Sequence, residues 1–97
     1  PYTTMFDRIL KQFQDLLLAR RYVITLHAYD EMGADDLSVW DVESAFLNGT
    51  VEECQRDRQT AERKYRIAGT ALDGRGIEVV AKLGPTGKLV IITVYAL

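Results

Sequence analysis

The fold is decided by residues 76–96, which read GIEVVAKLGPTGKLVIITVYA. In the first part of this stretch apolar residues alternate with Glu78 and Lys82, a period of two that is typical of a strand with one wetter side. The segment Gly84–Gly87 contains a proline that presets one dihedral and glycines that allow positive φ, so it predicts a hairpin turn. Residues 89–96 are almost wholly apolar and predict a second strand with both faces partly covered.

The same period extends back through the carboxy-terminal half of the chain. Turn chemistry divides this half into four segments, which predict strands at about residues 50–57, 63–72, 76–83 and 88–96. Strands joined by such short turns must run antiparallel, because a parallel return needs a long crossover. The sequence therefore predicts a four-stranded antiparallel sheet.

A helix-start signature opens the amino-terminal half. Thr4 with Asp7 three residues later predicts a helix that carries one apolar stripe and ends near Arg20. Residues 22–26 are rich in aromatic and β-branched side chains and predict a short strand, and residues 27–32 predict one or two helical turns.

A second main helix follows. Gly33 is expected to interrupt the preceding helical turns, and Ser38 with Asp41 repeats the capping signature. The pair Asn48-Gly49 predicts left-handed backbone that ends this helix before the first strand of the sheet.

We therefore expect one α+β domain over residues 1–97, with amphipathic helices packed on the sheet. Its parts are an N-terminal helix (1–20), a short strand with helices (21–49) and the antiparallel sheet (50–97). Of the 97 residues, 47 % are hydrophobic and 27 % charged, which is a globular composition. No apolar run approaches the roughly 20 residues that cross a bilayer, and no basic-then-apolar leader opens the sequence, so we expect a cytosolic protein without a membrane partner.

Charge and ligand-forming residues narrow the class of function. A formal net charge of −2 lacks the basic footprint of a general nucleic-acid binder. Cys54 is the single cysteine and there is one histidine, so the chain has too few ligands for a structural zinc site, and we expect no metal site and no cofactor. We interpret Cys54 and Trp40 as packing residues.

The histidine offers an acid–base pair. His27 and Glu31 are four residues apart, so on a helix the carboxylate can orient the imidazole and stabilise its charge. The alternative interpretation is that His27 caps or packs the helix start and Glu31 is solvated.

A basic segment opens the second predicted strand, and its five cations lie within eleven residues: Arg56, Arg58, Arg63, Lys64 and Arg66. Alternation sends Lys64 and Arg66 to one face, where they can form a phosphate clamp. Alternatively, these charges are solvated strand ends that pair with nearby acids. On the last strand, Tyr95 can position a substrate, or it is a core residue with a satisfied hydroxyl.

The motifs His27-Ala28-x-x-Glu31-Met32, Glu62-Arg63-Lys64-Tyr65 and Thr93-Val94-Tyr95 resemble a bacterial family of small proteins with a domain of unknown function. The resemblance covers roughly residues 22 to 97. Because that family is regarded as related to the RelE and BrnT toxins, the resemblance implies a RelE-like architecture of helices on an antiparallel sheet. It also implies RNA cleavage by 2′-hydroxyl attack with sheet-borne side chains, and an antitoxin partner in a type II toxin–antitoxin pair.

Two functions are therefore predicted. The first is a metal-independent endoribonuclease toxin in which His27 is the general base or acid, Glu31 orients it, Lys64 and Arg66 hold the scissile phosphate, and Tyr95 assists. Its partners would be an RNA substrate and an antitoxin-like protein. The second is a non-catalytic interaction module whose sheet edge or first helix docks a partner protein or a second copy, giving a homo-oligomer.

Overall fold

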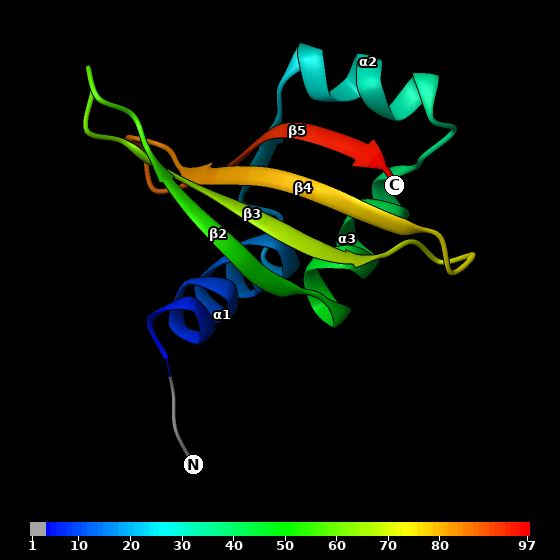
Figure 1. Cartoon of the computed structure of the whole chain (residues 1–97), viewed down its shortest axis with the longest axis horizontal. Coiled ribbons are helices and arrows are strands. Elements are labelled where there is room, and N and C mark those ends of the chain that lie inside the picture. The colour runs from blue at the N-terminus through cyan, green and yellow to red at the C-terminus, as the bar shows by residue number, and fades with distance from the viewer. Residues whose placement is uncertain (1–3) are drawn as a thin grey trace.

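A computed structural model describes residues 4–97 of the chain. Its helices and strands follow in the order α1 (Met5–Leu18), β1 (Tyr22–Ile24), α2 (Leu26–Ala34), α3 (Val39–Asn48), β2 (Thr50–Arg56), β3 (Arg63–Thr70), β4 (Gly76–Leu83) and β5 (Leu89–Ala96). The predicted α+β class is confirmed, with helices on both sides of one sheet (Figure 1). Within residues 4–97, no helix combines the length and the apolar character that spanning a membrane requires.

The sheet has five strands in the order β1-β5-β4-β3-β2. The pairs β2–β3, β3–β4 and β4–β5 are antiparallel, as predicted, but β1 pairs in parallel with β5, so that Tyr22 lies opposite Leu89. The prediction of four purely antiparallel strands is therefore wrong. A strand of three residues has too little pattern to reveal a partner that is remote in sequence.

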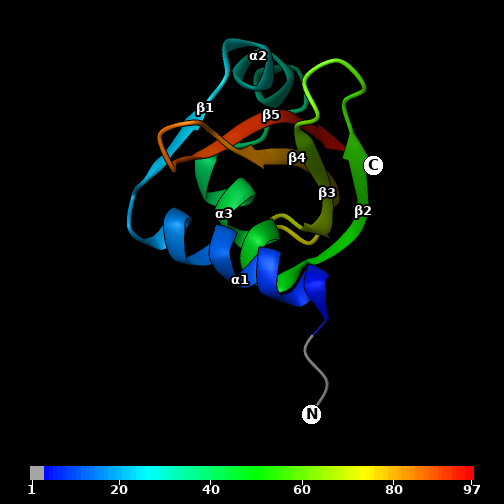
Figure 2. The same ribbon diagram turned by 90° about the vertical axis from the view of Figure 1, so that its left-hand side faces the viewer.

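Helices α1 and α3 cover one face of the sheet (Figure 2) and enclose the core with it. The predicted capping box of Thr4 and Asp7 starts α1, whose apolar stripe buries Phe13 and Leu17 completely or almost so. The Phe13 ring makes an edge contact with Tyr65 of β3 at a centroid distance of 5.7 Å. The amphipathic first helix is therefore docked on its own sheet, through its apolar side.

Helix α3 ends where it meets the sheet. The predicted left-handed stop is wrong, because Gly49 is extended (φ −92°, ψ −177°). Glycine is required there for space: a Cβ on Gly49 would lie 2.3 Å from the carbonyl oxygen of Ala45, and one on Gly69 of β3 would lie 2.4 Å from the same oxygen. The backbone at the carboxy-terminal end of α3 thus lies directly against β3.

Three expectations about single residues of the fold are also wrong. Trp40 is 68 % exposed, because it lies on the outer side of the first turn of α3, and Cys54 is exposed, because β2 is an edge strand. Gly33 does not interrupt the helical turns, since α2 continues through it to Ala34.

The close contact at Gly69 can be tested by adding one methyl group. We expect Gly69→Ala to lower the free energy of unfolding by about 1–3 kcal/mol, because either the β3 backbone or α3 must shift. Gly33→Ala is the matched control: apart from its chain neighbours and the nearby backbone of its own helix, no atom lies within 4 Å of its Cβ position, and alanine in a helix should raise stability by roughly 0.5–1 kcal/mol. Urea denaturation of both variants measures the difference, and equal stabilities would contradict the contact.

Asp41 joins the start of α3 to the β3–β4 turn. The residue is 9 % exposed, and its carboxylate accepts hydrogen bonds from the backbone N–H groups of Ser38 (2.8 Å) and Leu72 (3.0 Å). The bonds from Ser38 and Leu72 hold the pKa of Asp41 below its ordinary 3.8. The charged form of this carboxylate therefore stabilises the folded state.

We expect Asp41→Asn to destabilise the protein by about 1–2 kcal/mol at pH 7. The folded-state pKa lies below the unfolded one, so this stability is present above about pH 4 and is lost as the pH falls through the folded pKa. The difference in the free energy of unfolding between wild type and Asp41→Asn should therefore decrease at acidic pH. Urea denaturation at a series of pH values measures it. Asp30→Asn is the control, at an exposed position of α2, and its free energy of unfolding should equal that of wild type at every pH.

Candidate functional site

The face of the sheet opposite α1 and α3 carries polar side chains, and we call it the open face. Only α2 lies on this side, above β5 (Figure 2). The strand register places Glu53 of β2 opposite Arg66 of β3, and Glu78 of β4 opposite Tyr95 of β5. Side chains alternate along a strand, so these four point away from the core.

These four residues form one group joined by hydrogen bonds and ion pairs, the Glu78 cluster. Arg66 Nη1 donates to Glu78 Oε2 at 2.7 Å, and Arg66 Nε lies 3.5 Å from Glu53 Oε1. The Tyr95 hydroxyl donates to the other oxygen of Glu78. Both oxygens of Glu78, whose side chain is 15 % exposed, are thus occupied by donors from the two flanking strands.

The cluster changes the acidity of the phenol. The hydrogen bond to Glu78, partial burial and the charge of Glu78 together raise the pKa of Tyr95 above its ordinary 10.0. Tyr95 therefore remains a neutral hydrogen-bond donor at physiological pH. Of the two interpretations of Tyr95, the satisfied hydroxyl is observed, but on the open face and not in the core.

The pair of His27 and Glu31 lies in α2. Thr25 caps this helix by accepting from the N–H of Ala28, and His27 Nε2 then lies 3.2 Å from Glu31 Oε1. The histidine side chain is 68 % exposed, so it can meet a ligand from solvent. The predicted spacing thus produces the predicted contact.

Glu31 has a second, structural contact. The same Oε1 accepts the backbone N–H of Val94 at 3.1 Å, and Asp35, one helical turn later, accepts the N–H of Ala96 at 2.8 Å. These two bonds fix α2 along the part of β5 that β1 does not reach. Glu31 is close enough for its charge to contribute to the raised pKa of Tyr95, so the His27–Glu31 pair borders the Glu78 cluster.

Lys64 stands apart from the cluster. It precedes Arg66 by two residues on the same face of β3, and it lines a hollow of about 210 Å³ with Gln55, Arg56 and Asp57 at the end of the β2–β3 hairpin. Arg66, its partner in the predicted clamp, contacts two carboxylates instead. The structure therefore places Lys64 with the hairpin and Arg66 with Tyr95.

Sequence reasoning missed Glu78 as a site residue. Alternation had placed it on the wetter side of its strand, which is correct, but only the cross-strand register reveals that it lies between Arg66 and Tyr95. The open face consequently offers a carboxylate, a guanidinium, a phenol and an imidazole, which together can bind an anion and transfer protons.

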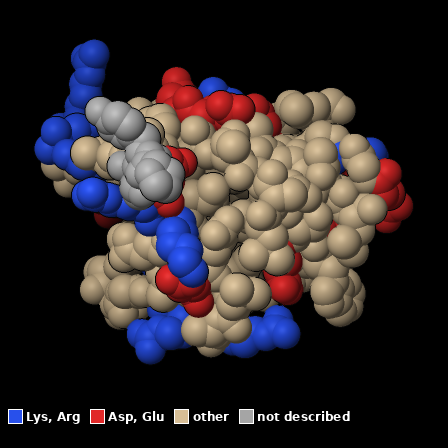
Figure 3. Space-filling model, turned by 90° about the horizontal axis from the view of Figure 1, so that it is seen from below, with Lys and Arg blue, Asp and Glu red and all other residues tan. Residues whose placement is uncertain are grey.

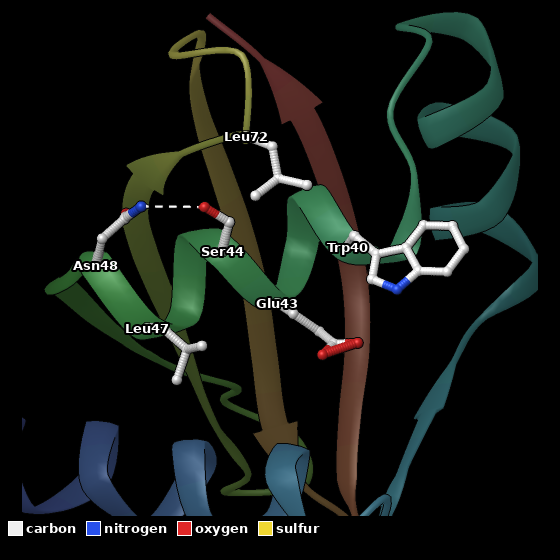
Figure 4. Close-up of a pocket in the computed structure, with 6 residues that line it drawn as sticks. All are labelled: Trp40, Glu43, Ser44, Leu47, Asn48 and Leu72. Atoms are coloured by element: carbon white, nitrogen blue, oxygen red, sulfur yellow. Dashed lines mark hydrogen bonds between the residues drawn. The ribbon is translucent and has the colours of Figure 1, made fainter.

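A second concave surface lies on the outer side of α3. It has a volume of about 380 Å³ and is lined by Trp40, Glu43, Ser44, Leu47, Asn48 and Leu72 (Figure 4). Its apolar residues are exposed, Leu72 by 71 % and Leu47 by 51 %. It is separate from the open face, because α3 covers the other side of the sheet.

Comparison with known families gives one match. The model of a domain of unknown function, DUF4258, matches residues 24–96, a range that contains both His27–Glu31 and the Glu78 cluster and leaves out α1. No curated protein and no solved structure matches the chain significantly. Within the described residues, no three His, Cys, Asp or Glu side chains come together as a metal site.

The Tyr95–Glu78 bond can be tested by titration. We expect Glu78→Gln to lower the pKa of Tyr95 towards 10, because the variant removes the carboxylate that stabilises the protonated phenol. The phenolate absorbance of each variant, with Tyr95→Phe subtracted, follows this one group among five tyrosines. Glu62→Gln removes a carboxylate that pairs with Lys82 and should leave the titration unchanged; an unshifted Glu78→Gln curve would contradict the bond.

Proposed function

The chain belongs to the DUF4258 family of domains of unknown function, and we propose that it is an endoribonuclease that cleaves RNA on the open face of its sheet without a metal ion. The observation that carries the proposal is that the His27–Glu31 pair and the Glu78 cluster share that face, with Glu31 close enough for its charge to contribute to the raised pKa of Tyr95. The first supplies an exposed imidazole with a positioned carboxylate. The second supplies a cation and a neutral phenol.

These groups match the requirements of RNA cleavage by internal attack. A base removes the proton of the 2′-hydroxyl, and the 2′-oxygen bonds to phosphorus. The bond from phosphorus to the 5′-oxygen then breaks, and an acid protonates that oxygen, so the products are a 2′,3′-cyclic phosphate and a 5′-hydroxyl. We assign His27 to one proton transfer, with Glu31 orienting it, and the Tyr95–Glu78 pair to the other.

Arg66 is proposed to stabilise the negative charge that develops on the phosphate. Its contacts with Glu78 and Glu53 use Nη1 and Nε, so Nη2 is directed to neither carboxylate. A guanidinium has five N–H donors, and the remaining ones suit phosphate oxygens. Lys64, on the same face, is proposed to hold a neighbouring phosphate of the strand.

From the expected relationship of this family to the RelE and BrnT toxins, we propose that the enzyme acts as a toxin with an antitoxin-like partner. Expression in a bacterium would then arrest growth, and His27→Ala would relieve the arrest. A small gene next to that of this protein would encode the partner.

One observation favours the alternative of an interaction module. The exposed apolar hollow on α3, with Trp40, Leu47 and Leu72, suits a protein partner or a second copy. The first helix, by contrast, is already docked on its own sheet. Under this alternative, Trp40→Ala would abolish association while His27→Ala would have no effect.

The test is incubation of purified protein with single-stranded RNA in excess EDTA. We expect fragments that end in 2′,3′-cyclic phosphate, and a rate that falls by about 10²–10⁴-fold in His27→Ala, because one proton transfer is lost. The exposed position of His27 means that this variant should remain folded.

Lys11→Ala is the control, because it removes a cation from the exposed side of α1. It should cleave at the wild-type rate, and an oligodeoxynucleotide should remain intact. Intact RNA with the wild-type protein, or equal cleavage by His27→Ala, would refute the proposal.

A further inference from the structure

The β2–β3 hairpin carries four cations without carboxylate partners: Arg56, Arg58, Arg63 and Lys64. Elsewhere in residues 4–97 most lysines and arginines form ion pairs: Lys11, Arg20, Arg66, Arg75 and Lys82. The hairpin projects at one end of the sheet (Figure 1). Figure 3 shows Lys and Arg side chains on that side of the molecule and a second group along the lower edge of the view, while the centre is largely uncharged.

The strand register brings two of these charges face to face. Arg56 lies directly opposite Arg63 across the β2–β3 pair, and like charges in this position destabilise a sheet. Neither of the nearest acids forms an ion pair with Arg56 or Arg63. Asp57 accepts the turn amides of Gln59 (2.8 Å) and Thr60 (3.0 Å), and Glu62 pairs with Lys82.

The turn itself is well ordered by hydrogen bonds. The Asp57 N–H donates to the Glu62 carbonyl at 2.8 Å, and the Ala61 N–H donates to the Asp57 carbonyl at 2.9 Å. Arg58 is therefore held at the tip of a defined loop. Lys64, at the base, shares its face of β3 with Arg66, roughly 7 Å further along the strand.

We propose that the β2–β3 hairpin binds the backbone of single-stranded RNA and guides the strand onto the open face. The proposal rests on the proposed function and deepens it, because it names how the substrate is held. In the Glu78 cluster, Arg66 is flanked by two carboxylates and so provides no net positive charge to attract a polyanion. The unpaired hairpin cations provide that attraction. Arg56 and Lys64 line one hollow, and Lys64 shares the face of β3 that carries Arg66.

Arginine side chains and the charge asymmetry favour a nucleic acid as the occupant. Three of the four cations are arginines, whose planar fork binds phosphate oxygens in pairs. The chain as a whole has a net charge of −2, so attraction for a polyanion has to come from a local group of cations such as the four at the hairpin. The contacts involve the backbone, and binding should therefore depend little on base sequence.

The experiment measures binding separately from cleavage. The probe is a fluorescent single-stranded 2′-O-methyl oligoribonucleotide, which has no 2′-hydroxyl proton and cannot be cleaved by internal attack. Anisotropy is recorded over a range of salt concentrations for wild type and for the variant Arg56→Gln/Arg58→Gln/Arg63→Gln. The control variant is Arg8→Gln/Lys11→Gln/Arg20→Gln on α1 and its carboxy-terminal end, which changes the net charge by the same amount.

We expect the hairpin variant to bind at least about tenfold more weakly than the control. The slope of log K against log salt should be less steep by about 2, because each lost phosphate contact on a single strand accounts for about 0.7. Cleavage of ordinary RNA by the hairpin variant should show a raised KM with kcat retained.

Equal binding by the hairpin variant and wild type, or no binding by wild type, would overturn the inference. Displacement of the probe by polyglutamate at the same concentration of charge would also overturn it, since the hairpin would then recognise an acidic protein. If the probe binds as expected but ordinary RNA stays intact, the inference stands and the endoribonuclease proposal fails. If RNA is cleaved but the hairpin variant binds the probe as tightly as wild type, the endoribonuclease proposal stands and the inference about the hairpin fails.

Discussion

The site depends on how the free backbone amides of β5 are satisfied. The short strand β1 pairs only with the beginning of β5, so the N–H groups of Val94 and Ala96 need other acceptors. Glu31 and Asp35, one helical turn apart, supply them. Because buried amides are costly to leave unpaired, this requirement fixes α2 along the sheet and thereby brings the imidazole of His27 next to the strand that carries Tyr95.

Several residues of the open face combine structural and chemical roles. Glu31 holds both an amide of β5 and His27 through one oxygen, and Glu78 holds both Arg66 and Tyr95. A carboxylate that accepts from two donors has a fixed orientation, because turning it towards one donor would break its bond with the other. Such fixed geometry is what catalysis by oriented groups requires, since it removes reorganisation from the reaction step.

The two faces of the sheet use charge differently. Beneath α1 and α3 the core is apolar apart from Asp41, whose carboxylate caps α3 and the β3–β4 turn. On the open face, acids and bases pair across the strands, and the unpaired cations are concentrated at the β2–β3 hairpin. A protein of net negative charge can in this way present a local positive surface.

The sequence by itself determined the local structure. Capping boxes at Thr4 and Ser38 start the main helices, alternation identifies β2 to β5, and the four-residue spacing brings His27 to Glu31, because each of these effects acts over a few neighbouring residues. Tertiary structure alone decided the parallel pairing of β1, the exposure of Trp40, and the meeting of Arg66, Glu78 and Tyr95. These features depend on strand order, register and helix placement. Those follow from the packing of the whole chain, so no pattern within a short segment predicts them.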